Sequence, residues 1–199
     1  FVKDHLFDPN RTILGADQEN WLGAQLAASK DRGTTWQVIG QQVLMGKLVI
    51  PAVPDDVAAK MKAQLPDEYS DRLDVDGLKP LAEAKLPLNL DAWDGYPLCR
   101  ERVHAAFKQL ASNPVVLAGD THNAWAFNMR NYQGEAVGVE IGTPGISSPG
   151  LESYLPAPPK LVSELLKASS SEIHDLDTSR RGWTVVEFGP EQMTSTWRF

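Results

Sequence analysis

The stretch with the clearest chemical potential is a short apolar run that ends in an acid and an imidazole. Residues 115–118 are all apolar, which predicts a buried strand, and Gly119-Asp120-Thr121-His122 follows directly. Gly119 permits a sharp exit from the strand. Asp120 and His122 supply an oxygen and a nitrogen ligand that could reach one metal ion. A metal held there can polarise a phosphoryl oxygen and lower the pKa of bound water.

An Asp-x-His pair on its own has a second interpretation. Asp commonly forms turns, and a partly buried His commonly makes only a structural hydrogen bond. Spacing alone leaves both interpretations open. The order of strand, Gly-Asp-x-His and a polar residue, here Asn123, is the layout expected of a metallophosphoesterase ligand loop, and it favours the metal.

The elements around this turn follow an α/β order. Helical spacing predicts helices over 17–29, 98–110 and 161–167, with Asp17 as the cap of the first. Strands are predicted over 35–43, 115–118, 124–130 and 136–141, and a terminal hairpin over 183–188 and 193–199. Residues 1–16 and the acidic cluster of Glu172, Asp175 and Asp177 are predicted to be irregular. The fold class is therefore α/β with a mixed sheet.

Composition excludes several classes of protein. The chain has 199 residues, 42% of them hydrophobic, which suits one domain or a large piece of one. Its net charge of -7 argues against a nucleic-acid groove, and no apolar run is long enough to predict a membrane span. A single cysteine, Cys99, excludes an internal disulfide and a cysteine zinc cluster. No initiator Met or signal peptide is visible, so we expect a start inside a longer chain.

Residues 51–92 differ in texture from the rest. They are rich in Pro, Asp and Lys and contain short helical pieces such as 57–64. We interpret them as a surface excursion or lid inserted between elements of the core.

Six blocks in order resemble the PhoD-type alkaline phosphatases. They cover nearly the whole chain, and six in sequence are far more specific than any one. The blocks are residues 11–22 ("R-x-x-L-G-x-x-Q-x-x-W-L"), 36–43, 93–100 ("W-D-G-Y-P-x-x-R"), 119–125, 138–140 with 147–150 ("V-E-F … S-S-P-G") and the closing strands over 181–183 and 194–199.

The resemblance implies a fold and an activity. It implies a mixed β-sheet sandwich flanked by helices, the four-layer αββα arrangement, with metals at the strand ends. It implies hydrolysis of small phosphomonoesters or phosphodiesters by a secreted or periplasmic enzyme that uses iron together with calcium. On this resemblance Asp120 and His122 are metal ligands and catalytic residues.

The chain also departs from the family. The earlier Asp, Cys and Asn ligand blocks of the family have no counterpart here, and Cys99 does not match the family's metal-binding Cys. We therefore expect residues 1–199 to be the C-terminal part of one catalytic domain, with its own N-terminal half as a possible partner.

Further residues could contact substrate or brace the ligands. Asn123 could touch phosphate or simply form the turn, and Arg100 could bind phosphate or pair with Asp94 or Glu101. Tyr96 could line the pocket or pack in its Gly-Tyr-Pro turn. Other candidates with a structural alternative are Gln41, as a ligand brace or a sheet-edge amide, and Arg180-Arg181, as a guide for anions or a plain loop.

Three functional hypotheses follow. The first is a metallophosphatase in which a metal-bound hydroxide attacks phosphorus. The second is a non-catalytic fragment, because two protein ligands are too few for a tight metal site. The third is a carbohydrate-active or esterase-like α/β enzyme, which would need an activated serine, and no Gly-x-Ser-x-Gly sequence occurs.

Overall fold

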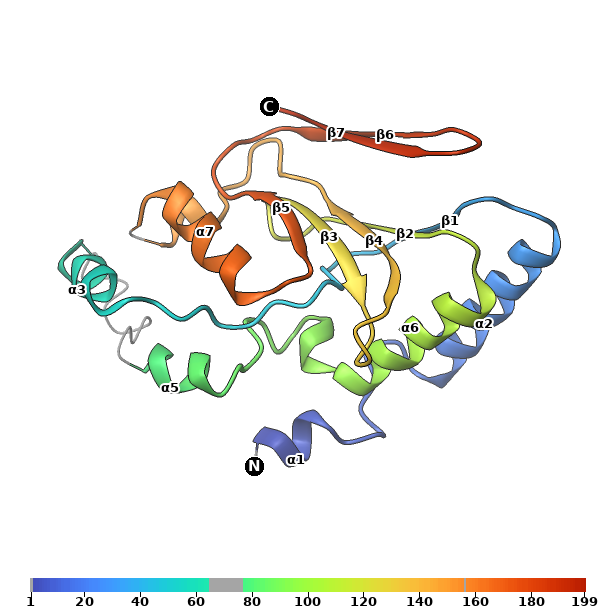
Figure 1. The fold of residues 1–199 in the computed structure, drawn as a ribbon, viewed down its shortest axis with the longest axis horizontal. Helices are drawn as coiled ribbons and strands as arrows, with labels where there is room; N and C mark the ends of the chain where they lie inside the picture. The colour runs from blue at the N-terminus through green and yellow to red at the C-terminus, as the bar shows by residue number, and fades with distance from the viewer. Residues whose placement is uncertain (1, 65–76, 156) are drawn as a thin grey trace.

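A five-stranded mixed sheet forms the centre of the molecule (Figure 1). The computed structural model describes residues 2–64, 77–155 and 157–199. The strands, in sheet order, are β1 (Gln37–Gly40), β2 (Pro114–Ala118), β4 (Ala136–Gly142), β3 (Ala124–Arg130) and β5 (Ile173–Asp177). β1, β2 and β4 run parallel, and β3 is antiparallel to β4 and β5. The carboxyl ends of β1, β2 and β4 therefore meet at one edge of the sheet.

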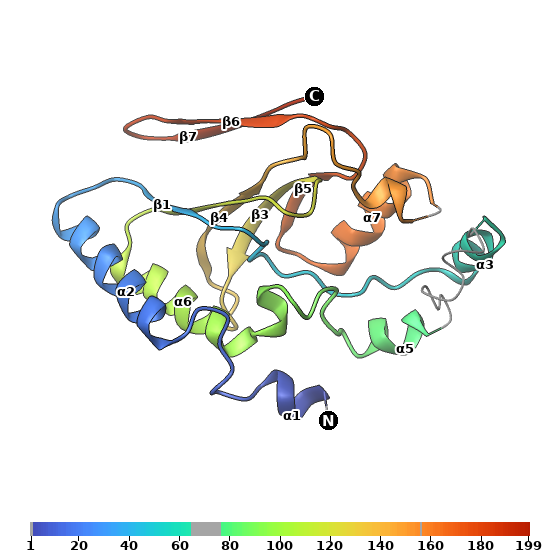
Figure 2. The ribbon, with the colours of Figure 1, turned by 180° about the vertical axis from the view of Figure 1, so that it is seen from behind.

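Helices cover one face of this sheet and a separate hairpin covers the other (Figures 1 and 2). Helices α2 (Ala16–Asp31) and α6 (Pro97–Leu110) pack together on the first face, and α7 (Pro159–Ser169) packs beside β5. On the second face lies a two-stranded antiparallel sheet of β6 (Trp183–Phe188) and β7 (Met193–Arg198). The remaining elements are α1 (Val2–Leu6), α3 (Asp55–Gln64), α5 (Leu78–Glu83), η1 (Trp93–Gly95) and η2 (Leu151–Ser153).

The core lies between the sheet and α6. Alternation along β3 places Trp125, Phe127 and Met129 on this side, all almost completely buried. Phe107 of α6 and Leu26 of α2 belong to the same cluster. Within the described part of the chain, no helix is long and apolar enough to cross a lipid bilayer.

Three buried carboxylates hold the segment that follows β1. Four successive backbone N–H groups, those of residues 45–48, each donate to one of them. We call residues 45–48 the anchored segment. Met45 and Gly46 donate to the two oxygens of Glu140 (2.8 and 2.7 Å), Lys47 to Glu172 (3.2 Å) and Leu48 to Asp94 (2.8 Å).

Burial raises the pKa of all three carboxyl groups. The pKa of Glu140, which is fully buried on β4, rises to about 7, against the lowering effect of the hydrogen bonds from Met45 and Gly46. The pKa values of Asp94 and Glu172 also rise on burial, while the positive charge of Arg100 acts in the opposite direction on both.

Arg100 forms a buried ion pair with Asp94, and its Nη1 also donates to the carbonyl oxygen of Met45 (3.3 Å). Both side chains are only 7% exposed. The pair therefore connects helix α6 to the anchored segment through one guanidinium group.

The structure agrees with most of the predicted elements and corrects others. The helices over 98–110 and 161–167, the strands over 115–141 and the terminal hairpin are confirmed within a few residues. The cap of α2 is Gly15, not Asp17. The strand predicted over 35–43 shortens to 37–40, and residues 2–6 form a helix where irregular chain was predicted.

The acidic cluster near residue 175 is also corrected. Residues 173–177 form β5, where a loop was predicted. Ile173 and Leu176 turn inward, and a shift of register against β3 breaks the regular alternation. Because of this irregularity, the sequence over 173–177 lacks the alternation of apolar and polar residues that identifies a strand.

Replacement of Arg100 by Met tests the buried ion pair. The change leaves the Asp94 carboxylate buried without its counter-ion, so we expect a loss of about 3–5 kcal/mol in the free energy of unfolding. Urea unfolding followed by circular dichroism measures it. Lys167→Met, which removes an exposed pair with Asp175, is the control and should cost less than about 1 kcal/mol. Equal losses in the two variants would contradict the role given to Arg100.

The buried imidazole of His104 predicts that the fold loses stability in acid. Its ring is buried, and burial lowers its pKa to about 3. The positive charge of Arg100 adds to this shift, and a hydrogen bond with the backbone of Arg130 opposes it. Because the unfolded imidazole protonates near pH 6.5, stability present above that pH is lost as the pH falls toward 3.

His104→Leu should remove this dependence. Between pH 7 and pH 4.5 the native chain should lose roughly 2–3 kcal/mol more than the variant. Urea unfolding at a series of pH values measures the difference. Parallel pH profiles for the two proteins would show that His104 does not titrate as described.

Candidate functional site

The carboxyl edge of the sheet carries the strongest candidate site. β2 ends at Ala118 and runs directly into the turn 119–123, which we call the ligand turn. The N–H of Gly119 donates to the carbonyl of Gln42 (3.1 Å), and Trp125 Nε1 donates to Thr121 Oγ1 (2.8 Å). These bonds fix the base of the turn against the chain that leaves β1.

Asp120 and His122 both adopt left-handed backbone conformations, with φ of 66° and 58°. Such conformations cost a non-glycine residue about 1 kcal/mol or more each. Two of them within three residues, in a turn held by surrounding contacts, are typical of a functional site, where strain serves to aim side chains.

The imidazole of His122 has one nitrogen engaged. Its Nδ1 lies 2.8 Å from the carbonyl oxygen of Pro149. A carbonyl only accepts, so in the neutral imidazole Nδ1 carries the hydrogen and Nε2 has the lone pair. This arrangement, in which one ring nitrogen is oriented by a backbone carbonyl, is usual for a histidine that binds metal through the other.

Asp120 offers an uncommitted carboxylate. It is exposed, and no described residue donates a hydrogen bond to its side chain or forms an ion pair with it. Asp120 and His122 therefore carry one oxygen donor and one nitrogen donor in the same turn. Nowhere in the described part of the chain do three His, Cys, Asp or Glu side chains gather closely enough to hold a metal ion.

Asn123 braces the neighbouring loop instead of pointing into solvent. Its side chain is fully buried, and its Oδ1 accepts from the N–H of Leu151 (3.1 Å). A Cβ at Gly150 would come within 2.5 Å of Asn123 Nδ2, so only glycine fits there. Nδ2 has no partner among the described residues.

Arg181 connects the ligand turn to the loop over 143–153. Its Nη1 donates to the carbonyl oxygens of His122 (2.7 Å) and Ser148 (2.6 Å), and its Nη2 donates to Glu152 (2.9 Å). The sequence indicated only that Arg180-Arg181 might guide anions. Because His122 lies 59 positions away, no local pattern could reveal this bond.

The other predicted residues occupy two different places. Gln41 follows β1 at the same edge, where its Oε1 accepts from Trp93 Nε1 (2.7 Å) and its Nε2 donates to Glu140 (3.2 Å). Arg100 is committed to Asp94, and the ring of Tyr96 lies under the guanidinium of Arg11 (4.7 Å). Among the described residues, no hydrogen bond, ion pair or ring contact joins Tyr96 or Arg100 to the ligand turn.

Comparison with known proteins identifies the family. The model of the PhoD-like phosphatase family matches residues 2–197. Alkaline phosphatase D of Bacillus subtilis (strain 168) is 32% identical over 127 residues, which are 63% of this chain and 16% of that protein. A solved structure described as "Structure of PhoD" covers 98% of this chain and 34% of its own, at 23% identity and a TM-score of 0.60, which shows a shared fold.

The chain thus spans well under half the length of both relatives. The family match nevertheless runs from residue 2 to residue 197 and includes the ligand turn. The chain belongs to the PhoD-like phosphatase family.

Proposed function

We propose that the chain is the C-terminal part of a catalytic domain that hydrolyses phosphate esters. The observation that carries this proposal is the ligand turn, in which Asp120 and His122 carry donor atoms not committed to other described residues, at the carboxyl edge of the sheet. The family match over residues 2–197 supports it, as does the likeness to alkaline phosphatase D. Small phosphomonoesters or phosphodiesters are the proposed substrates, and the periplasm or the cell exterior is the proposed location.

The donor atoms of the ligand turn fit part of a metal centre. His122 offers Nε2 because its Nδ1 is held by Pro149, and Asp120 offers a carboxylate without another partner. Iron together with calcium is the proposed pair of metals. When bound, they would polarise a phosphoryl oxygen and lower the pKa of a water molecule. Two ligands do not complete such a centre, so the remaining ligands lie outside the described residues, and an N-terminal half of the domain is their proposed source.

The surrounding residues keep the two ligands in position. Arg181 fixes the carbonyl of His122, and Asn123 fixes the loop that supplies the Pro149 carbonyl. Gln41 connects Glu140 to Trp93 below the turn. Arg100 and Tyr96 act in the fold, and we assign them no contact with substrate.

The hairpin β6–β7 supports a four-layer αββα arrangement. It lies across the face of the main sheet opposite α2 and α6 (Figure 2), so the order of layers is helices, sheet and second sheet. We propose that strands and helices from an N-terminal half extend the second sheet and cover it. Residues 51–92 remain a proposed surface excursion, and residues 65–76 of it lie outside the described part of the chain.

A second candidate function is that of a non-catalytic fragment. The observation favouring it is that the described residues provide only a two-ligand site. Such a fragment would fold around the same core but hold metal weakly, because a partial coordination shell binds metal poorly.

His122→Ala tests the ligand assignment in the complete catalytic domain. Loss of the imidazole should lower the metal content and reduce phosphatase activity by at least about 100-fold, while circular dichroism remains unchanged. Elemental analysis and hydrolysis of p-nitrophenyl phosphate measure the two effects. His174→Ala, at an exposed position on β5, is the control. Activity that survives within a few-fold would show that His122 is not a ligand.

Arg181→Met tests the positioning role of Arg181. The change removes the bonds that hold the His122 and Ser148 carbonyls, so we expect weaker metal binding and a fall in kcat of about 10-fold or more. Arg180→Met is the matched control, because Arg180 pairs with Asp177 and lies over the ring of Phe199. If both variants lose metal affinity equally, the effect is a general one of charge, and the positioning role is refuted.

A further inference from the structure

A charged cavity lies at the edge of the sheet opposite the ligand turn. Its volume is about 530 Å³. It is bounded by the chain after β1, the end of α5, the β3–β4 turn and the α7–β5 connection. β3 begins beside the ligand turn and ends at Arg130 on the cavity wall, a span of about 20 Å for seven residues. The cavity is therefore separate from Asp120 and His122.

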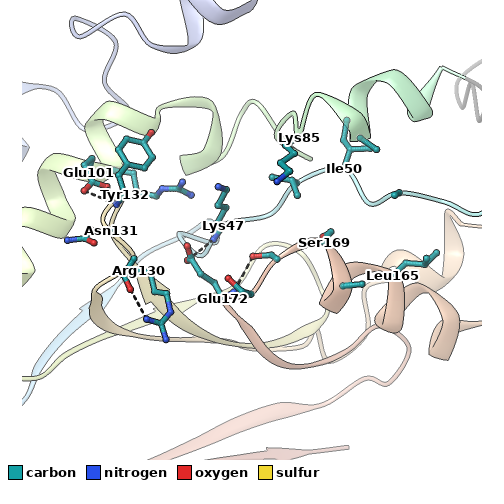
Figure 3. A pocket seen from close by; sticks show the side chains of 18 residues that line it. Lys47, Ile50, Lys85, Glu101, Arg130, Asn131, Tyr132, Leu165, Ser169 and Glu172 are labelled. Atoms are coloured by element: carbon teal, nitrogen blue, oxygen red, sulfur yellow. Dashed lines mark hydrogen bonds between the residues drawn. The ribbon is translucent and has the colours of Figure 1, made fainter.

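Three cationic side chains of this cavity have no acidic partner among the described residues: Lys47, Lys85 and Arg130. Arg130 donates only to the carbonyl of Gly134 (2.7 Å). Figure 3 shows Lys47 and Lys85 in the middle of the cavity, with Tyr132 on one side and Leu165 on the other. Cations gathered in a cavity without counter-ions create a field that attracts an anion.

The two acidic side chains of the cavity, Glu101 and Glu172, accept hydrogen bonds from backbone N–H groups. Glu101 accepts from the backbone N–H of Tyr132 through both oxygens (3.2 Å each), and Glu172 accepts from the N–H of Lys47 (3.2 Å). Burial raises the pKa of Glu172, against the lowering effect of the hydrogen bond from the N–H of Lys47. The fourth cation of the wall, Arg100, is paired with Asp94. Lys47, Lys85 and Arg130 are exposed and form no ion pair with a described residue, although the charge of Lys47 acts on buried Asp94.

The backbone conformation of Lys85 independently supports a role for its side chain in the cavity. Lys85 follows the end of α5 with φ of 51°, a left-handed position that glycine or asparagine usually occupies. A lysine there costs about 1 kcal/mol in backbone strain. The strain is consistent with a side chain that is needed at this place in the cavity.

Part of the wall is apolar. Val49, Ile50 and Leu165 line it, and the half-exposed ring of Tyr132 flanks it. A ligand suited to the whole cavity has an anionic head and a small apolar or aromatic body. Lysine ammonium groups bind phosphate-type oxyanions well as point charges.

We infer that this cavity binds a small organic anion, with a phosphate-type head on an apolar body, at a site distinct from the ligand turn. Lys47, Lys85 and Arg130 contact the head, and Ile50, Leu165 and Tyr132 contact the body. The inference does not depend on the proposed function, because none of these residues belongs to the ligand turn.

The test uses phenylphosphonate, which has the required head and body and no ester bond to hydrolyse. Titration into the metal-free, nitrogen-15-labelled 199-residue chain should shift the amide signals of Lys47, Lys85 and Ser169 saturably. The amides of Asp120 and His122 should not move. Benzyl alcohol, which lacks the charge, should cause no saturable shift.

Variants of the two lysines provide the decisive comparison. Lys47→Gln and Lys85→Gln should each weaken phenylphosphonate binding about tenfold, the loss expected for one charge-assisted hydrogen bond. Lys160→Gln, at an exposed position at the start of α7, should leave binding unchanged. Thermal unfolding of each variant confirms that it is folded.

Three results would overturn the inference. These are the absence of saturable shifts, shifts confined to the ligand turn, and equal affinity in the native chain and both cavity variants. The last two would locate the anion elsewhere. None of the three bears on whether His122 binds metal in the complete domain.

Discussion

The structure depends on four successive backbone N–H groups that are satisfied by three buried carboxylates. An unpaired buried carboxylate costs several kcal/mol, and an unpaired buried amide costs about 1–3 kcal/mol, so neither set is stable without the other. Glu140 comes from the middle of the sheet, Asp94 from the turn before α6, and Glu172 from the chain before β5. The anchored segment therefore joins three parts of the fold that no local interaction brings together.

Hydrogen bonds from residues just before the anchored segment connect these carboxylates to the candidate site. Gln41 bonds to Glu140, and the carbonyl of Gln42 accepts from Gly119 at the base of the ligand turn. The turn is thus fixed from below by the network around Glu140 and from the side by Arg181. Support from two directions can hold Asp120 and His122 in left-handed conformations that an isolated turn would not keep.

Local patterns in the sequence predicted the parts of the fold that local physics determines. The apolar run before Gly119 identified β2, helical spacing identified α6, and alternation with a Gly-Pro turn identified the terminal hairpin. β5 was missed because its exposed His174 and Asp175 stand side by side, where a regular strand alternates.

The candidate site itself stays a prediction, and sequence patterns indicate only part of it. Asp120 and His122 could be selected because an acid and an imidazole follow a buried strand at short spacing. The roles of Glu140 and Arg181 could not, because each acts across 59 to 95 positions of sequence. For Arg100, the alternative of pairing with Asp94 describes its geometry, and only the folded structure distinguishes this from a phosphate contact.

The central claim is that this chain holds part of a metal centre whose other ligands lie outside it. The most direct measurement is elemental analysis of the purified 199-residue chain and of the complete catalytic domain, after dialysis against the same iron and calcium concentrations. The account predicts near-stoichiometric metal in the complete domain and little in the 199-residue chain. Equally tight, stoichiometric metal in the chain alone would contradict it.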